Sequence, residues 1–124
     1  MKNIDCTLYC ITNSDGMSEE TFLDKVKGAC EGGVTLVQLR EKDRSTLSYY
    51  ELACKVKKIT DAYKIPLIID DRIDVAMAVG CGVHLGAEDM PISVARSIMG
   101  KDAIIGATAK TVEAAIQAEQ DGAD

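Results

Sequence analysis

The fold is indicated first by the stretch Thr35-Leu36-Val37-Gln38-Leu39-Arg40-Glu41-Lys42, an apolar run that ends in charged residues. A short run of this kind is typical of a buried β-strand with a polar tip. Successive side chains of a strand point to opposite faces, so Gln38, Arg40 and Lys42 share one face and the residues between them lie on the other. The stretch therefore predicts a strand whose carboxyl end presents an amide and two cations to one side.

Apolar runs of the same kind recur along the chain, and each is followed by a helical pattern. Strands are expected at 8–12, 35–40, 67–69, 83–85 and 103–107, and helices at 18–31, 45–65, 73–79, 91–99 and from 111 onward. Regular alternation with nearly continuous apolar strands favours parallel strands that are covered by helices. The helix that begins at Ser45 has an apolar stripe reaching Tyr63, and the last helix is expected to turn Val112 and Ile116 inward.

Two architectures fit this alternation, an open doubly wound sheet and part of a (β/α)₈ barrel. The loop Asn13-Ser14-Asp15-Gly16 after the first strand lacks the glycine-rich fingerprint that doubly wound sheets usually carry there. Polar groups instead follow several different strands, as they do in barrels. A complete barrel takes about 250 residues. We therefore expect one α/β domain over residues 1–124, formed by the first five strand–helix units of a (β/α)₈ TIM barrel, which is incomplete in this chain because the three C-terminal units are absent.

Composition excludes several classes of protein. The chain has 124 residues and a net charge of −6, and its basic residues are dispersed, so nucleic-acid binding is not expected. No apolar run approaches the ~20 residues of a membrane span. The five cysteines and single histidine do not cluster, which argues against a zinc site. The expected location is the cytoplasm, with reduced thiols.

Charged residues at the strand tips carry the candidate chemistry. Arg40 and Lys42 can grip phosphate oxygens. Asp70 and Asp71 end the third predicted strand, and Asp89 follows the fourth. Each of these acids could also cap the helix that comes after it. Paired carboxylates and phosphate oxygens are what Mg²⁺ prefers, so a metal site at Asp71 and Asp89 is the favoured interpretation.

Signals on the later strands are weaker. His84 lies in mid-strand between apolar residues and is interpreted as a hydrogen-bonded core residue rather than a catalyst. Thr108 and Lys110 follow the fifth strand, where a hydroxyl and backbone N–H groups before a helix can hold a phosphate.

Three segments taken together resemble the thiamine-phosphate synthases: Gly33 to Lys42, Pro66 to Arg72, and Gly82 to Pro91. The likeness covers essentially the whole chain in order and spacing. It implies a (β/α)₈ barrel that joins hydroxymethylpyrimidine diphosphate to thiazole phosphate, releasing thiamine phosphate and diphosphate, with Mg²⁺ as cofactor. The implied mechanism breaks the C–O bond to diphosphate first, and the thiazole nitrogen then attacks the resulting cation.

The resemblance also assigns roles to residues. It implies that the diphosphate and its pyrimidine are held by a group of substrate-binding residues: Gln38, Arg40, Glu41, Lys42, Asp70 and Thr108. Arg40 and Lys42 would also be catalytic, since they would stabilise the charge on the departing diphosphate. Asp71 and Asp89 would bind the magnesium ion.

Departures from the family pattern keep other functions open. Asp70 stands where the family usually has asparagine, and Lys110 stands where a histidine is common. A thiazole tautomerase-like paralogue is one alternative, although it would lack the paired metal acids. A non-catalytic partial barrel that binds diphosphate is another, and open sheet edges would allow it to self-associate as a homo-oligomer.

Overall fold

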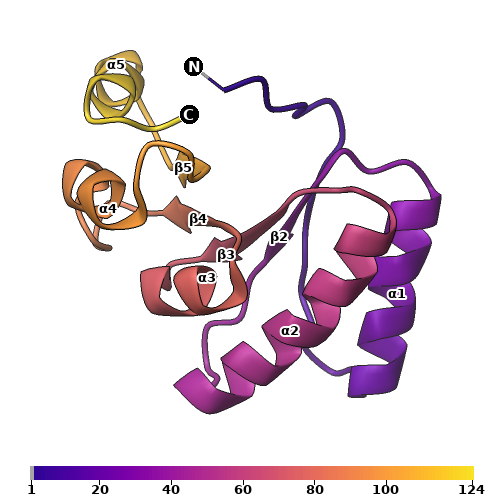
Figure 1. Ribbon diagram of the computed structural model, residues 1–124. Coiled ribbons are helices and arrows are strands. Elements are labelled where there is room, and N and C mark those ends of the chain that lie inside the picture. Colours follow the sequence, from indigo (N-terminus) through magenta and orange to yellow (C-terminus); the bar gives the residue numbers. More distant parts are fainter. Residues whose placement is uncertain (1) are drawn as a thin grey trace.

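The structure is a computed structural model that describes residues 2–124. Its strands and helices alternate strictly along the chain (Figure 1). In chain order they are β1 (Tyr9–Ile11), α1 (Glu19–Glu31), β2 (Leu36–Leu39), α2 (Thr46–Ala62), β3 (Leu67–Asp70), α3 (Ile73–Val79), β4 (Gly82–Leu85), α4 (Ile92–Met99), β5 (Ile105–Ala107) and α5 (Val112–Gln120).

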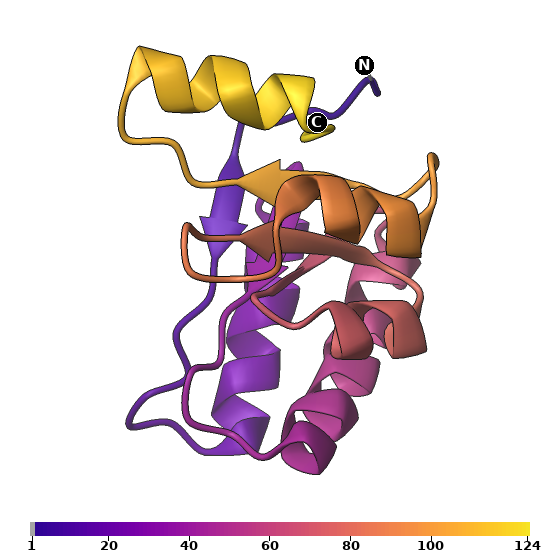
Figure 2. The same cartoon turned by 90° about the vertical axis from the view of Figure 1, so that its left-hand side faces the viewer.

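The five strands form one parallel sheet in the order β1-β2-β3-β4-β5. A doubly wound sheet reverses its strand order at a switch point, so the sequential order excludes that alternative. The strands form a half-barrel, and the helices lie in an arc around it, with α1 and α2 at one end and α5 at the other (Figures 1 and 2). The expected α/β class and parallel strands are confirmed.

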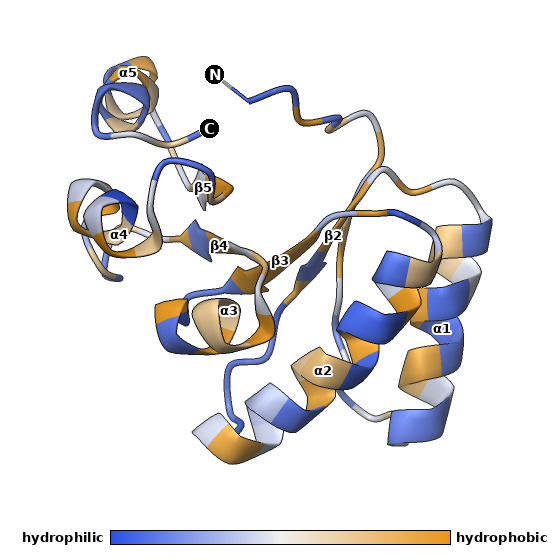
Figure 3. Ribbon diagram, viewed as in Figure 1, coloured by the Kyte–Doolittle hydropathy of each residue, from blue (hydrophilic) through white to orange (hydrophobic). Residues whose placement is uncertain are grey.

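The core lies between the outward face of the sheet and the helices. Val37, Leu39, Ile69, Val83 and Leu85 face the helices and are at most 1% exposed. Each such apolar side chain stabilises the fold by about 1.5–3 kcal/mol on burial. Figure 3 shows α1 and α2 as alternating hydrophilic and hydrophobic stripes, which is the pattern of helices with one buried face.

The helix starts agree with the capping residues in the sequence. The side chains of Ser18, Ser45 and Thr111 accept hydrogen bonds from backbone N–H groups in the first turns of α1, α2 and α5. Gly80 ends α3 in the left-handed conformation with φ of 78°. These local signals therefore predicted the starts of α1, α2 and α5 and the end of α3 to within one residue, whereas α2 ends at Ala62, three residues before the expected end at residue 65.

Two expectations about buried faces are wrong. Tyr63 lies after the end of α2, is 36% exposed, and donates its hydroxyl to Glu31. Val112 and Ile116 on α5 are 72% and 51% exposed, and α5 buries none of its residues. The apolar spacing of α5 is present, but no described element packs against that face. Among residues 2–124, none of the helices combines the length and apolar character needed to cross a bilayer.

Candidate functional site

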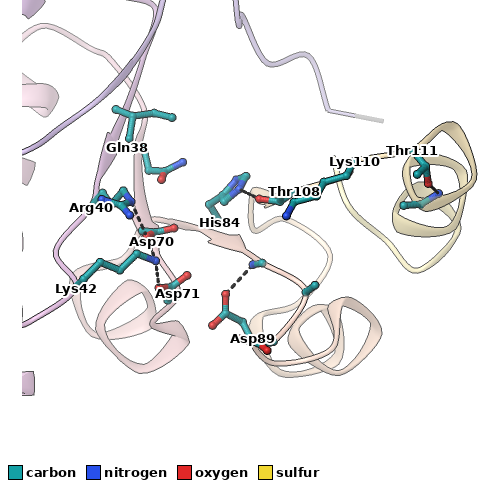
Figure 4. Close-up of a pocket in the computed structure, with 15 residues that line it drawn as sticks. Gln38, Arg40, Lys42, Asp70, Asp71, His84, Asp89, Thr108, Lys110 and Thr111 are labelled. Atoms are coloured by element: carbon teal, nitrogen blue, oxygen red, sulfur yellow. Dashed lines mark hydrogen bonds and ion pairs between the residues drawn. The ribbon is translucent and has the colours of Figure 1, made fainter.

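A cleft of about 880 Å³ lies at the carboxyl ends of β2 to β5. It is lined by residues from each of these strand ends and from the loops that follow them (Figure 4). The lining includes most of the residues that the sequence singled out: Gln38, Arg40, Lys42, Asp70, Asp71, Asp89, Thr108 and Lys110. Segments far apart in the chain therefore converge at one rim, as the strand pattern predicted.

The cationic side of the cleft comes from β2 and the residues after it. Gln38 is 2% exposed, and its amide donates to the Tyr9 hydroxyl at 2.7 Å. Arg40 and Lys42 lie further along the same face with nearly half of each side chain exposed. The depth of Gln38 and the exposure of the two cations fit a strand that runs from a packed interior to the open rim of the cleft.

Lys42 joins this cationic side to the acids of β3. Its ammonium lies 2.9 Å from Asp70 Oδ2 and also pairs with Asp71 Oδ2. These contacts, first the hydrogen bond to Asp71 and then that to Asp70, raise the pKa of Lys42 above its ordinary value. The amine therefore stays charged, and in this state its charge is directed to the two carboxylates.

Asp70 is the most buried charged group of the cleft, at 5% exposure. Its Oδ2 pairs with the Lys42 ammonium at 2.9 Å and lies 3.8 Å from Arg40 Nε. The charge of this buried carboxylate is therefore compensated by cations of the cleft rather than by solvent.

Asp71 occupies a strained turn. Its φ is 65°, which is uncommon for any residue but glycine, although aspartate tolerates it best. The Asp71 N–H donates to the His84 carbonyl at 2.8 Å, and the Arg72 N–H donates to the Asp70 carbonyl at 2.8 Å. The capping alternative for Asp70 and Asp71 is wrong, because α3 has Arg72 at its N-cap and no side-chain cap. Strain of this kind gathers at functional sites.

Asp89 faces Asp71 across the cleft. One of its oxygens accepts from the Gly86 N–H at 2.6 Å. The N-cap residue of α4 is Pro91 and no side chain caps this helix, so the capping alternative is wrong here too. The carboxyl groups of Asp71 and Asp89 are close enough for each to shift the pKa of the other.

The two acids respond in opposite ways to their surroundings. Burial, and then the neighbouring Asp71, raises the pKa of Asp89. Burial also pushes the pKa of Asp71 upward, but hydrogen bonds from Lys42 and Asp89 outweigh it and leave that pKa below its ordinary value. These opposite shifts mean that the two carboxyl groups interact, and a cation placed between them would favour the charged form of both.

The donor set suits magnesium but is not a complete cage. Within residues 2–124, no group of three or more His, Cys, Asp or Glu side chains is arranged to hold a metal ion by itself. Mg²⁺ needs only one or two carboxylates, since water and substrate phosphates complete its octahedral shell. Asp71 and Asp89 meet that requirement, and Asp70, paired with Lys42, lies close by.

The far side of the cleft comes from β4 and β5. His84 projects into it, and its Nε2 lies 2.9 Å from Thr108 Oγ1. Lys110 adds a third cation in the loop that leads to α5, whose N-cap is Thr111 (Figure 4). His84 was interpreted from the sequence as a core residue, but it lines the cleft. Its inward register on β4, in line with Asp70 on β3, was the signal that could have found it.

Two other placements differ from a reading of the sequence alone. Glu41 lies outside the cleft lining, with its side chain 8% exposed and 3.2 Å from Arg44 Nε. Tyr49, on α2, was not singled out. Its hydroxyl donates to the Leu39 carbonyl at 2.7 Å and lies 3.2 Å from the Asp70 carbonyl, so it ties together the tips of β2 and β3.

Comparison with known proteins agrees with this geometry. The family model described as thiamine monophosphate synthase matches residues 8–124. The chain is 53% identical over 124 residues to thiamine-phosphate synthase of Clostridium acetobutylicum, covering 99% of this chain and 59% of that protein. It is 56% identical over 118 residues to thiamine-phosphate synthase 2 of Streptococcus pneumoniae, covering 94% of this chain and 56% of that protein.

A solved structure supports the same assignment. Thiamine phosphate pyrophosphorylase from Pyrococcus furiosus superposes with a TM-score of 0.86 and 42% identity, over 94% of this chain and 56% of that one. The chain thus spans less than two thirds of the length of the relatives it matches. On the family model and on these identities, the chain belongs to the thiamine monophosphate synthase family.

Proposed function

We propose that this chain supplies the diphosphate-binding and magnesium-binding part of a thiamine-phosphate synthase. The reaction is a transfer in thiamine biosynthesis: hydroxymethylpyrimidine diphosphate and thiazole phosphate give thiamine phosphate and diphosphate. The observation that carries the proposal is the convergence of Arg40 and Lys42 with the acid pair Asp71 and Asp89 at one cleft. Phosphate-gripping cations beside metal-binding acids are what a metal–diphosphate leaving group requires.

Asp71 and Asp89 would hold the magnesium ion. When bound, the ion would supply positive charge to the oxygens of the diphosphate. The chemistry of the donor set supports this assignment, because both acids line the cleft and carboxylate oxygens are ligands that Mg²⁺ takes together with phosphate oxygens and water. Lys42, which now neutralises Asp70 and Asp71, would then be released toward the substrate.

Other residues of the chain would bind and orient the diphosphate. Arg40 offers a planar pair of donors to two phosphate oxygens, and Lys42 offers a mobile point charge. Negative charge accumulates on the diphosphate as its C–O bond breaks, so contacts from these cations strengthen in the transition state. Gln38 and Thr108 supply neutral hydrogen bonds at either side, and Glu41 supports the loop from outside the lining.

The extent of the chain bears on its activity. We propose that residues 1–124 are the first five units of a (β/α)₈ barrel, and that the 124-residue chain alone has little synthase activity. Support comes from the sequential strand order and from relatives that are longer than the region matched. The strands β1 and β5 are edges of the sheet, which favours self-association of the chain. A cytoplasmic location, without a nucleic-acid or membrane partner, completes the proposal.

A non-catalytic diphosphate-binding partial barrel is the second candidate, because the chain spans only 59% of the Clostridium acetobutylicum relative. A tautomerase-like function is less well supported. A tautomerase would lack the acid pair Asp71 and Asp89, which is present here, and it would use a histidine after the fifth strand, where this chain has Lys110. Measuring diphosphate binding does not distinguish these two candidates from the proposed synthase function, whereas measuring synthase turnover does. Robust synthase turnover by the 124-residue chain would contradict the proposed incompleteness.

Titration calorimetry tests the diphosphate and metal site. Hydroxymethylpyrimidine diphosphate is titrated into the protein with and without Mg²⁺, and the titration with Mg²⁺ is repeated for Asp71→Ala. We expect strong heat only for the unsubstituted protein with Mg²⁺. Asp74→Ala is a matched control, because Asp74 pairs with Arg72 outside the cleft lining and its loss should leave the heat unchanged. Equal heats in the three main titrations would remove the site.

A further inference from the structure

A hydrogen bond between the side chains of His84 and Thr108 joins β4 to the loop after β5 inside the cleft. His84 Nε2 and Thr108 Oγ1 are 2.9 Å apart. Figure 4 shows the imidazole directed at the threonine hydroxyl, with both groups on the side of the cleft opposite Lys42. The interaction spans two neighbouring strands, so it sets the position of one lining residue by means of another.

The fold holds the imidazole in this orientation. His84 lies on the inward face of β4, where its neighbours in register are Asp70 on β3 and Gly106 on β5. A β-carbon at position 106 would stand 2.7 Å from His84 Nδ1, closer than any side chain permits. The ring therefore lies across a strand that carries no side chain at that point, and this directs its Nε2 to Thr108.

The direction of the hydrogen bond decides what the threonine can bind. A hydroxyl has one hydrogen to donate and lone pairs that accept. If Thr108 donates to Nε2, its lone pairs face the cleft, and these repel an anion. If Nε2–H donates to Thr108, the hydroxyl hydrogen is free to point into the cleft. Phosphate oxygens that carry no hydrogen only accept, so they require the second arrangement.

We propose that His84 is a positioning residue that donates Nε2–H to Thr108, so that the Thr108 hydroxyl donates its own hydrogen to a phosphate oxygen in the cleft. The inference rests on the proposed function, because it takes the ligand to be a diphosphate. It deepens that function by assigning His84 a part in selecting acceptor-only groups. His84 itself touches Thr108 and not the reacting atoms.

The single histidine of the chain makes this assignment measurable. Protein labelled with ¹⁵N at histidine gives one imidazole spin system, and the ¹⁵N shifts distinguish a protonated from an unprotonated ring nitrogen. With inorganic pyrophosphate and Mg²⁺ bound, we expect Nε2 to carry the hydrogen. A complex in which Nδ1 alone carries it would overturn the proposal.

Affinity gives a second, independent readout. We expect His84→Leu and Thr108→Val each to weaken pyrophosphate binding about tenfold, because the first leaves the Thr108 hydroxyl without the partner that orients it and the second removes that hydroxyl. The double variant should be no weaker than either, since both changes abolish the same oriented donation. Thr108→Ser keeps the hydroxyl, so it should bind more tightly than Thr108→Val and recover most of the lost affinity. Thr108 is exposed, so its variants keep the test valid if His84→Leu fails to fold.

The two proposals fail in different ways. If the unsubstituted protein does not bind pyrophosphate with Mg²⁺, the proposed function falls, and this assignment falls with it. If that protein binds while His84→Leu, shown to be folded by its amide spectrum, binds equally well, only the role of His84 is overturned. Additive losses in the double variant would also overturn it, since the two residues would then act separately.

Discussion

The imidazole of His84 occupies the space that a side chain at Gly106 would need. The position of a β-carbon on residue 106 is 2.7 Å from His84 Nδ1 and 3.6 Å from its Cγ. The ring cannot yield without losing its contact with Thr108, because that contact requires the present orientation. Two residues on adjacent strands thus depend on each other, and the absence of one side chain positions the other.

Replacing this glycine tests that dependence. We expect Gly106→Ala to displace the His84 ring, to lower the free energy of unfolding by about 1–3 kcal/mol through overpacking, and to weaken pyrophosphate binding. Urea unfolding and calorimetry measure the two effects. Gly28→Ala is the matched control: Gly28 is exposed on α1 with nothing within 4 Å of an added β-carbon. That change should stabilise the helix by about 0.5–1 kcal/mol and leave binding intact.

Tyr49 gives a second prediction, because its hydroxyl, on α2, contacts the backbone carbonyls at the ends of both β2 and β3. Burial raises its pKa above the ordinary value, so its hydroxyl remains a donor, to the Leu39 carbonyl, at 2.7 Å. Tyr49→Phe should cost about 1–2 kcal/mol of stability. It should also weaken pyrophosphate binding, since the carbonyl of Asp70, just before the strained Asp71, loses its contact with the phenol.

A control variant on the same helix separates these two effects. Thr60 is fully buried, and its hydroxyl donates to the Lys57 carbonyl at 3.2 Å, away from the cleft lining. Thr60→Val should lower stability without changing affinity. If Tyr49→Phe behaves in the same way, the phenol supports the fold and does not position the site.

The strand–helix order was predictable because each element carries its own local signal. Apolar runs marked the strands, and Ser18, Ser45 and Thr111 marked helix starts by capping. The face of α5 was not predictable, because periodicity states which residues share a side and not whether anything covers it. Val112 and Ile116 have the right spacing and remain exposed.

Site residues were predictable where the alternation of side chains along a strand places them. They were not predictable where a contact between two different elements places them. Alternation along β2 correctly placed Arg40 and Lys42 on one face, in the cleft. The same rule applied to β4 would have placed His84 there, but its apolar neighbours suggested a core position. Tyr49 belongs to an amphipathic helix, and nothing in the spacing shows that its hydroxyl reaches Leu39 and Asp70.

The third residue that gives a prediction is Asp124, whose carboxylate should make the free energy of unfolding depend on pH in the acid range. Its Oδ2 accepts from the Ile105 N–H at 2.9 Å and from Arg96 at 2.7 Å, and the side chain is 8% exposed. Burial raises its pKa, but these hydrogen bonds, with a further one from Lys2, outweigh burial and hold the pKa below the ordinary value. A carboxylate with a depressed pKa stabilises the fold above its unfolded pKa of about 3.9. That stability is lost as the pH falls through the folded pKa.

Asp124→Asn should therefore cost about 1.5–3 kcal/mol at neutral pH. The difference in unfolding free energy between the two proteins should stay constant down to about pH 4 and shrink below it. Urea unfolding at a series of pH values measures this. A difference that is the same at pH 3 and pH 7 would mean that the charge of Asp124 contributes nothing.

Asp70 gives the prediction that bears most directly on the ligand. Its buried carboxylate holds Lys42 at 2.9 Å and lies 3.8 Å from Arg40, so it competes with a diphosphate for both cations. Asp70→Asn removes that competition while keeping an acceptor of the same shape. We expect pyrophosphate to bind roughly tenfold more tightly in the presence of Mg²⁺, because charge interactions of a few kcal/mol at this range are relieved.

The same variant decides whether Asp70 serves the metal instead. If its Oδ2 is a magnesium ligand, Asp70→Asn will weaken pyrophosphate binding and raise the Mg²⁺ concentration needed for half-maximal heat. Asp74→Asn controls for a general change in charge, since Asp74 pairs with Arg72 outside the cleft lining. Tighter binding with an unchanged Mg²⁺ requirement would assign Asp70 to Lys42 alone and leave Asp71 and Asp89 as the metal pair.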